Sequence, residues 1–217
     1  MLNKNRLVEH LGVLRRAWDV PALRRVVDDL LSSPTTPNTF LALDTLLSCC
    51  VVEGDSDIGL RYAKIKLDLD PSDPFAHSLF GDLLFLTGEF ISSLTSYENA
   101  LRLLGEDTED SNYFAMTNDV ARVYFKQGRN SECRYLCNYH SPILESHADH
   151  GIAFLMPYVQ RLLLLGDVEA AERNHSLSLE LYRKASRATN GRNMMIDIDR
   201  SVQEKMWGSV NRSREIV

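Results

Sequence analysis

The sequence predicts an all-α fold, an α-solenoid in which antiparallel helix pairs stack side by side. Two observations predict it. Glycines recur at intervals of 34, 40 and 38 residues, at Gly54, Gly88, Gly128 and Gly166. Each of them lies between two segments whose apolar residues follow helical spacing. Since one helix pair cannot bury its own apolar face, pairs repeating about every 34 residues must stack into a continuous core.

Two segments account for the intervals that exceed 34 residues. Residues 106–111 are six hydrophilic residues suited to a surface loop, and removing them restores the period. Residues 140–151 contain Pro142, show little periodicity and can hold the four extra residues of the third interval. Pro157 falls inside the first helix of the last pair, where we expect it to kink the helix or to move its start.

The predicted array spans residues 37–189. Before it, residues 1–36 contain two amphipathic segments, 3–17 and 22–33, which we interpret as a degenerate helix pair or cap. This brings the array to about five helix pairs.

A further amphipathic helix is predicted within residues 190–217. Thr189-Asn190-Gly191 is a suitable helix stop, and an apolar stripe with i, i+3, i+7, i+11 spacing follows it. The stripe consists of Met195, Ile198, Val202 and Met206. This helix either caps the last pair, whose apolar face would otherwise be exposed, or docks in a groove or on a second subunit.

Residues 73–103 form the best-defined unit of the array. Its first helix has large, small and large residues and then the turn glycine at His77, Gly81, Leu84 and Gly88. Its second helix has small, aromatic and small residues at Ser93, Tyr97 and Ala100. Gly81 allows the helices to approach closely, and Gly88 makes the turn. This pattern resembles the tetratricopeptide repeat (TPR) family, and the resemblance implies a right-handed α-solenoid.

The other units keep the same register with weaker matches. Leu43, Leu47 and Cys50 precede Gly54, with Gly59 and Ala63 after it; Thr117, Ala121 and Tyr124 precede Gly128, with Cys133, Cys137 and His140 after it; Val159 and Leu162 precede Gly166, with Ala171, His175 and Ser178 after it.

The resemblance also implies an inner groove that is lined by the first helices and binds a peptide segment of a partner protein. Counted from the glycines, the groove positions are Leu41, Asp44, Ser48, Val51, Phe75, Ser78, Asp82, Phe85, Ala115, Asn118, Arg122, Phe125, Ala153, Met156, Gln160 and Leu163. We expect the three phenylalanines to anchor the peptide; alternatively, the array's own helices cover them.

A carboxylate clamp of the kind found in some TPR proteins is not expected. Asp44 and Ser48 stand where such a clamp has Lys and Asn. Asn118 and Arg122 can still hold one carboxylate or backbone group, because Arg forms bidentate pairs.

Composition excludes several classes of protein. The net charge of −6 argues against a general nucleic-acid binder, and no apolar run approaches the roughly 18 residues of a membrane-spanning helix. Charged residues interrupt the N-terminal apolar residues, so no secretory signal is predicted. The four cysteines form two tight groups, Cys49 with Cys50 and Cys133 with Cys137. This suits free thiols in a reducing compartment, and we predict a cytoplasmic protein.

No motif predicts enzymatic activity or a cofactor. Phosphate-binding glycine loops, nucleophile elbows and triad signatures are absent from the sequence. Cys133, Cys137 and His140 lie at i, i+4 and i+7, a spacing that could hold zinc. Because they also occupy packing positions of the repeat, we interpret them as core residues and predict no metal site.

The sequence therefore predicts a non-enzymatic adaptor or scaffold that binds a protein or peptide partner. Two alternatives remain open. One is a cytosolic chaperone of a secreted protein, and the other is a regulatory or localising subunit of a separate enzyme. Partner identity and homo-oligomerisation are also open, since repeat architecture alone indicates only a binding platform.

Overall fold

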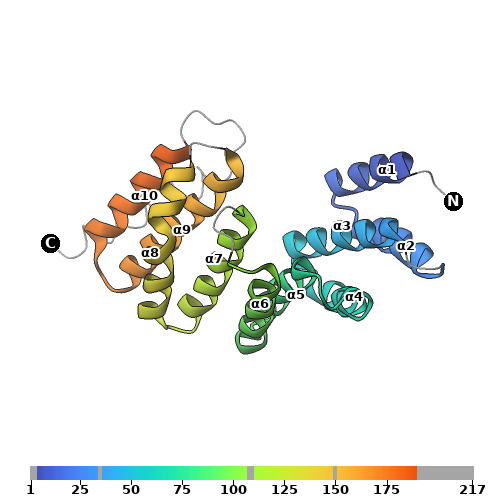
Figure 1. Ribbon diagram of the computed structural model, residues 1–217, viewed down its shortest axis with the longest axis horizontal. Helices are drawn as coiled ribbons and strands as arrows, with labels where there is room; N and C mark the ends of the chain where they lie inside the picture. The colour runs from blue at the N-terminus through green and yellow to red at the C-terminus, as the bar shows by residue number, and fades with distance from the viewer. Residues whose placement is uncertain (1–3, 34–35, 107–109, 149–150, 190–217) are drawn as a thin grey trace. The chain divides into compact units, whose positions relative to one another are not determined.

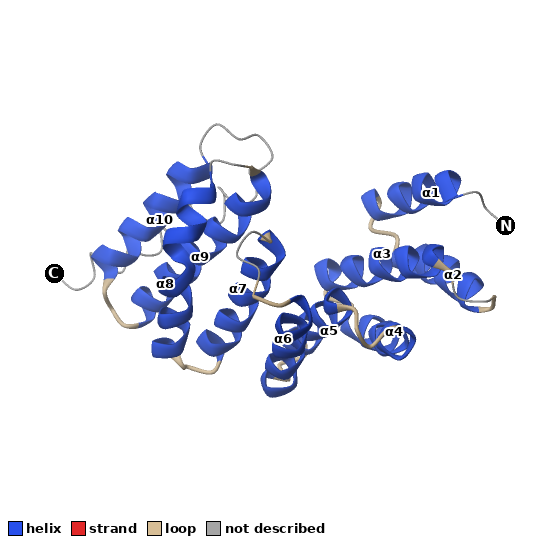
Figure 2. Ribbon diagram, in the orientation of Figure 1, coloured by secondary structure: helices blue, strands red, loops and turns tan. Residues whose placement is uncertain are grey.

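The computed structural model describes residues 4–33, 36–106, 110–148 and 151–189, and the predicted all-α fold is confirmed there (Figure 1, Figure 2). These residues form ten α-helices and no β-strand. The helices are α1 (Lys4–Arg16), α2 (Val20–Leu31), α3 (Pro37–Glu53), α4 (Ser56–Leu69), α5 (Pro74–Leu86), α6 (Phe90–Leu104), α7 (Ser111–Lys126), α8 (Asn130–His147), α9 (Ile152–Ala171) and α10 (His175–Thr189). The helix predicted within residues 190–217 lies outside the described residues.

Short polar side chains and prolines start several of these helices. Asp19, Asp73 and Asp110 cap α2, α5 and α7, where a carboxylate oxygen accepts a hydrogen bond from a backbone N–H of the first turn. Prolines occupy the first turns of α2, α3 and α5, where the missing N–H costs no helical hydrogen bond. Local chemistry therefore sets where these helices begin.

Helices α1–α6 belong to one compact unit, residues 1–105, called the N-terminal unit below. It consists of three helix pairs, α1 with α2, α3 with α4 and α5 with α6. Gly54 and Gly88 turn the second and third pairs with φ of 74° and 80°, and Trp18 turns the first with φ of 52°. Buried leucines such as Leu47 join the pairs into one apolar core.

Helices α7–α10 belong to a second compact unit, residues 106–217, called the C-terminal unit below. Its described part consists of two pairs, α7 with α8 and α9 with α10, and α7 also packs against α9. Gly128 turns the first pair with φ of 73°. Cys133 and Cys137 lie in its core with Val168.

The predicted turn at Gly166 is wrong, because this glycine lies inside α9. A Cβ on Gly166 would lie 2.2 Å from Cε1 of Tyr182, just as a Cβ on Gly81 would lie 2.8 Å from Cε1 of Tyr97. Gly166 therefore allows two helices to approach closely, which is the role predicted for Gly81. The turn comes later, where Arg173 has φ of 66°.

With its turn at Arg173, the last pair repeats the contacts of α5 and α6. The Tyr97 hydroxyl donates a hydrogen bond to Asp82 over 2.7 Å, and the Tyr182 hydroxyl donates to Asp167 over the same distance. Each tyrosine follows its carboxylate by 15 residues. These contacts place α9 and α10 in the register of the best-defined unit.

Two prolines lie inside helices. Helix α9 begins upstream of Pro157 and continues through it, so the helix does not start at this proline. Pro157 lacks the N–H that would have bonded the carbonyl of Ala153, an exposed residue in the first turn of the helix. Helix α8 contains Pro142 and continues to His147, so most of the segment that was expected to be aperiodic is helical.

Candidate peptide-binding groove

A hollow of about 280 Å³ lies between α7 and α9 in the C-terminal unit, and we call it the α7–α9 groove. It is lined by Asn118, Asp119, Arg122, Phe125, Lys126, Gln160, Leu163, Leu164 and Asp167. Five of the sequence-predicted positions thus lie together: Asn118, Arg122, Phe125, Gln160 and Leu163. Both helices are the first helices of their pairs, as the resemblance implied.

Asn118 forms the floor of the α7–α9 groove, and both the nitrogen and the oxygen of its side-chain amide are hydrogen-bonded. Its Nδ2 donates to the carbonyl of Pro157 and its Oδ1 accepts from Nε of Arg161, each over 2.8 Å. Nη2 of Arg161 also donates to Oγ1 of Thr117 over 2.9 Å. This network ties α7 to α9, and it leaves Asn118 only one further N–H to offer.

Arg161 is the buried cation of this network, with 1% of its surface exposed. Burial lowers its pKa to about 10, so the guanidinium stays charged at neutral pH. Its Nη1 has no hydrogen-bond partner in the described part of the chain. Two polar contacts from α7 therefore stabilise a charge that lies beneath the groove floor.

The groove surface combines an apolar base with charges of both signs. Phe125, Leu163 and Leu164 supply apolar surface, and Phe125 also packs against the core of the unit. Arg122 forms an ion pair of 3.1 Å with Asp119. A surface that combines apolar residues with charges of both signs suits the side chains of a peptide better than a purely apolar ligand.

The register of the last pair explains which predicted positions missed the groove. Met156 and Ala153 were counted from Gly166 and lie one to two helical turns before the groove. Counted from the turn at Arg173, the α9 positions begin at Gln160 and include Asp167, which does line it. The equal spacing of Gly81 to Tyr97 and of Gly166 to Tyr182 was the sequence signal for this register.

Several predicted positions in the N-terminal unit are engaged with neighbouring side chains. Asp44 forms an ion pair with the buried Lys66, which also contacts Asp73 at 2.7 Å. Burial raises the pKa of Asp44, and the hydrogen bond from Lys66 opposes this rise. Asp82 accepts from Tyr97, as described above, and the Phe85 ring packs edge-on against Phe90 with centroids 5.4 Å apart.

The remaining predicted positions of this unit are dispersed. Leu41 borders a shallow hollow of about 200 Å³ with residues of α1. The Ser48 hydroxyl donates to the backbone carbonyl of Asp44 over 2.8 Å. Phe75 is 45% exposed, and Ser78 is half-buried. They do not gather around one hollow as the α7–α9 residues do.

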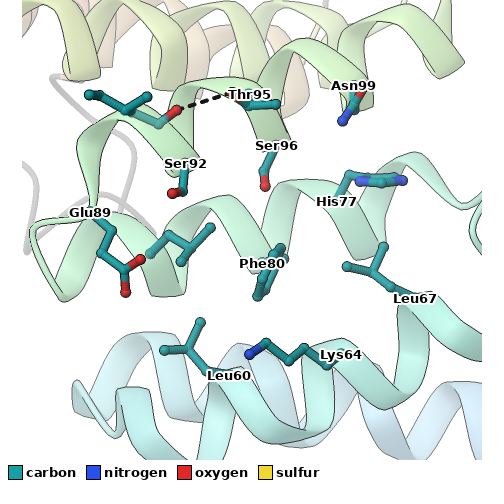
Figure 3. A pocket seen from close by; sticks show the side chains of 12 residues that line it. Leu60, Lys64, Leu67, His77, Phe80, Glu89, Ser92, Thr95, Ser96 and Asn99 are labelled. Atoms are coloured by element: carbon teal, nitrogen blue, oxygen red, sulfur yellow. Dashed lines mark hydrogen bonds between the residues drawn. The ribbon is translucent and has the colours of Figure 1, made fainter.

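A second, larger hollow lies in the N-terminal unit between α4 and α6, with α5 as its floor (Figure 3). We call it the α4–α6 slot. Its volume is about 530 Å³, and its lining includes Leu60, Lys64, Phe80, Ser96 and Asn99. The slot belongs to second helices, so the groove positions counted from the turns did not include it. A polar stripe at residues 92, 96 and 99 was the available sequence signal.

The cysteine and histidine cluster is part of the core. All four cysteines are free and buried. The His140 ring packs edge-on against Tyr113 and Phe114, with centroids 5.4 and 5.6 Å apart, and burial lowers its pKa. Within the described ranges, no three His, Cys, Asp or Glu side chains are placed to hold a metal ion.

Comparison with solved structures identifies the fold. The nearly identical TPR-like repeats of a kinesin light chain-like protein from Podosopora anserina superpose with a TM-score of 0.63 at 14% identity, covering 89% of this chain and 100% of theirs. A thermophilic TPR protein from Thermus thermophilus, TTC0263, gives 0.60 at 15% identity, covering 91% and 96%. PilF from Pseudomonas aeruginosa gives 0.62 at 10% identity, covering 98% and 90%. The chain has a TPR-like fold.

Sequence comparison adds no closer relative. No protein-family model matches the chain, and no curated protein matches it. Among the helices of the described residues, none has both the length and the apolar character needed to cross a membrane.

Proposed function

We propose that this protein is a non-enzymatic interaction module, an adaptor or scaffold, that binds a peptide segment of a partner protein in the α7–α9 groove. The observation that carries the proposal is the convergence of five predicted groove positions on one hollow. TPR-like architecture supports it as an analogy, because such repeats serve widely as binding platforms.

The size of the groove favours peptide side chains. Small-molecule and cofactor pockets typically enclose roughly 300–1,000 Å³ and bury most of the ligand. At about 280 Å³ and open to solvent, the α7–α9 groove falls just below that range. It therefore suits one or two anchoring side chains of a peptide whose remaining residues lie along the surface.

The groove chemistry indicates how the peptide is held. An apolar side chain packs on Phe125 and Leu163, where burial of apolar surface supplies most of the affinity. Arg122 and Lys126 offer charged donors at the rim, and Gln160 offers an amide that can pair with peptide backbone. Because Asn118 is already bound to Arg161 and Pro157, it shapes the floor more than it grips the ligand.

Site-specific photo-crosslinking in native cell lysate tests the proposal. Gln160 is exposed, so replacing it with p-benzoylphenylalanine places a crosslinker at the groove without disturbing the core. Glu180, exposed on α10 and outside the groove, provides the matched control position. We expect a partner to be captured from position 160 and not from position 180, and Arg122→Glu to reduce that capture.

The outcomes discriminate between functions as well as sites. Equal capture from both positions, or capture that Arg122→Glu leaves unchanged, would contradict groove binding. The identity of a selectively captured partner distinguishes the adaptor from the two alternatives: a secreted protein indicates the chaperone, and an enzyme indicates the regulatory subunit.

A further inference from the structure

The α4–α6 slot carries features of a second binding site, independent of the α7–α9 groove. Figure 3 shows side chains of α4 and α6 pointing toward one another across α5, with Phe80 between them. Leu60 and Leu67 line the α4 side, and Ser96 and Asn99 line the α6 side. The α4 wall therefore combines two leucines with Lys64, and the α6 wall, called the polar wall below, is mainly polar.

The polar wall has hydrogen-bonding groups without partners. Ser92, Ser96 and Asn99 lie at i, i+4 and i+7, so their side chains share one face of α6. None of the three makes a side-chain hydrogen bond within the described structure, whereas the neighbouring Thr95 hydroxyl donates to the carbonyl of Ile91. Ser96 is only 6% exposed and points into the slot. The hydroxyl and amide groups of this wall can therefore bond a ligand that enters the slot.

Apolar surface lies open beside these polar groups. Phe80 forms the middle of the floor between Leu60 and Leu67. Ile91, which also lines the slot, is 80% exposed. A ligand that covers this surface gains free energy by removing it from water.

The charged residues of the slot favour one orientation of an acidic ligand. Lys64 extends from α4 into the slot, is exposed and forms no ion pair with any described residue. Glu89 lies at one end, and His77 and Asn99 lie at the other (Figure 3). A carboxylate on the ligand is complementary to Lys64 and is repelled by Glu89, so we place it away from the Glu89 end.

The length of the polar wall matches a short extended peptide. Residues 92 and 99 are separated by seven steps of about 1.5 Å along the helix, or roughly 10 Å. An extended chain rises about 3.3 Å per residue, so three residues span this distance. Their backbone amides and carbonyls can pair with the serine hydroxyls and the asparagine amide.

We propose that the α4–α6 slot binds an extended segment of a partner protein that carries an apolar residue and an acidic residue within three positions of each other. The apolar side chain packs on Phe80, the backbone lies along Ser92, Ser96 and Asn99, and the carboxylate pairs with Lys64.

Selection from a phage-displayed library of random heptapeptides on the full chain tests this proposal. We expect enriched peptides to contain Asp or Glu within three residues of a bulky apolar residue. Lys64→Glu should weaken their binding about tenfold or more, the effect of losing one charge-assisted contact. Arg102→Glu makes the same charge change on α6 outside the slot, and it should leave their binding unchanged.

Further variants locate the bound peptides. Asn99→Ala and Ser96→Ala should each weaken binding several-fold with unchanged circular dichroism, because each removes a hydrogen-bonding side chain of the slot without altering the apolar core. Arg122→Glu, in the α7–α9 groove, should have no effect. Failure to enrich any peptide, enrichment without acidic residues, or loss of binding with Arg122→Glu instead of Lys64→Glu would overturn the proposal while leaving the α7–α9 groove to its own test.

Discussion

The substitution Gly166→Ala measures how tightly α9 and α10 pack. The new Cβ would lie 2.2, 2.6 and 3.0 Å from three ring carbons of Tyr182. That ring is 2% exposed and its hydroxyl is held by Asp167, so it cannot move aside without losing contacts. Overpacking of this kind costs about 1–3 kcal/mol, against roughly 1 kcal/mol gained from alanine's helix propensity. Because three ring carbons lie within 3.0 Å of the new Cβ, we take the upper part of that cost, roughly 2–3 kcal/mol, which leaves a net loss of about 1–2 kcal/mol.

Calorimetry and guanidinium unfolding provide the assay. For a chain of this size each kcal/mol shifts the melting temperature by roughly 2–4 °C. Gly12→Ala is the control, since its Cβ would meet only the guanidinium end of Arg16 at 3.6 Å within helix α1. This control should gain up to about 1 kcal/mol.

A double-mutant cycle isolates the contact between Gly166 and Tyr182. In a Tyr182→Ala background the ring is absent, so Gly166→Ala should become stabilising by about 1 kcal/mol. The explanation of close helix approach is refuted if Gly166→Ala alone is neutral or stabilising, or if its cost persists without the Tyr182 ring.

Three further substitutions test other features of the structure. Arg173→Gly should raise the melting temperature, because a non-glycine residue at φ of 66° costs about 1 kcal/mol. An unchanged melting temperature would contradict a left-handed backbone at this turn. Lys66→Met should lower the free energy of unfolding by about 1–3 kcal/mol, because Asp44 and Asp73 lose the cation that they share. The loss is moderate because Asp44 stays partly hydrated. Unfolding in urea measures this change, and a neutral result would show that the two ion pairs contribute little. Burial lowers the pKa of His140 below its ordinary 6.5, so the unfolded chain binds the proton more readily, and stability should decline as pH falls below about 6.5. His140→Phe keeps an aromatic ring and should flatten that decline between pH 5 and 7.5 in thermal melts; identical slopes in both proteins would contradict it.

Turn positions show how far local sequence predicts this fold. Gly54, Gly88 and Gly128 were recognisable because glycine adopts positive φ without a steric penalty. At the last pair the positive φ belongs to Arg173, a residue type that gives no such signal. Gly166 gave the same signal as a turn glycine for a different reason, the approach of Tyr182, and only the packing of two helices separates the two cases.

In the candidate sites, too, local signals predicted some residues and contacts between helices decided others. Groove positions on α7 followed from the turn at Gly128, so Asn118, Arg122 and Phe125 were predicted correctly as neighbours on one helix. The hydrogen bond from Arg161 to Asn118 joins residues 43 positions apart, and no local sequence pattern predicts it.

Helical periodicity, turn glycines and capping residues act over a few neighbouring positions, and they were sufficient for the helix pairs, their order and the TPR-like fold. The α4–α6 slot required more, because Leu60 and Ser96 line the same slot only after α5 has packed between their helices. Which side chains are buried, left without partners or gathered around a hollow depends on contacts between helices, and these contacts form only in the folded chain.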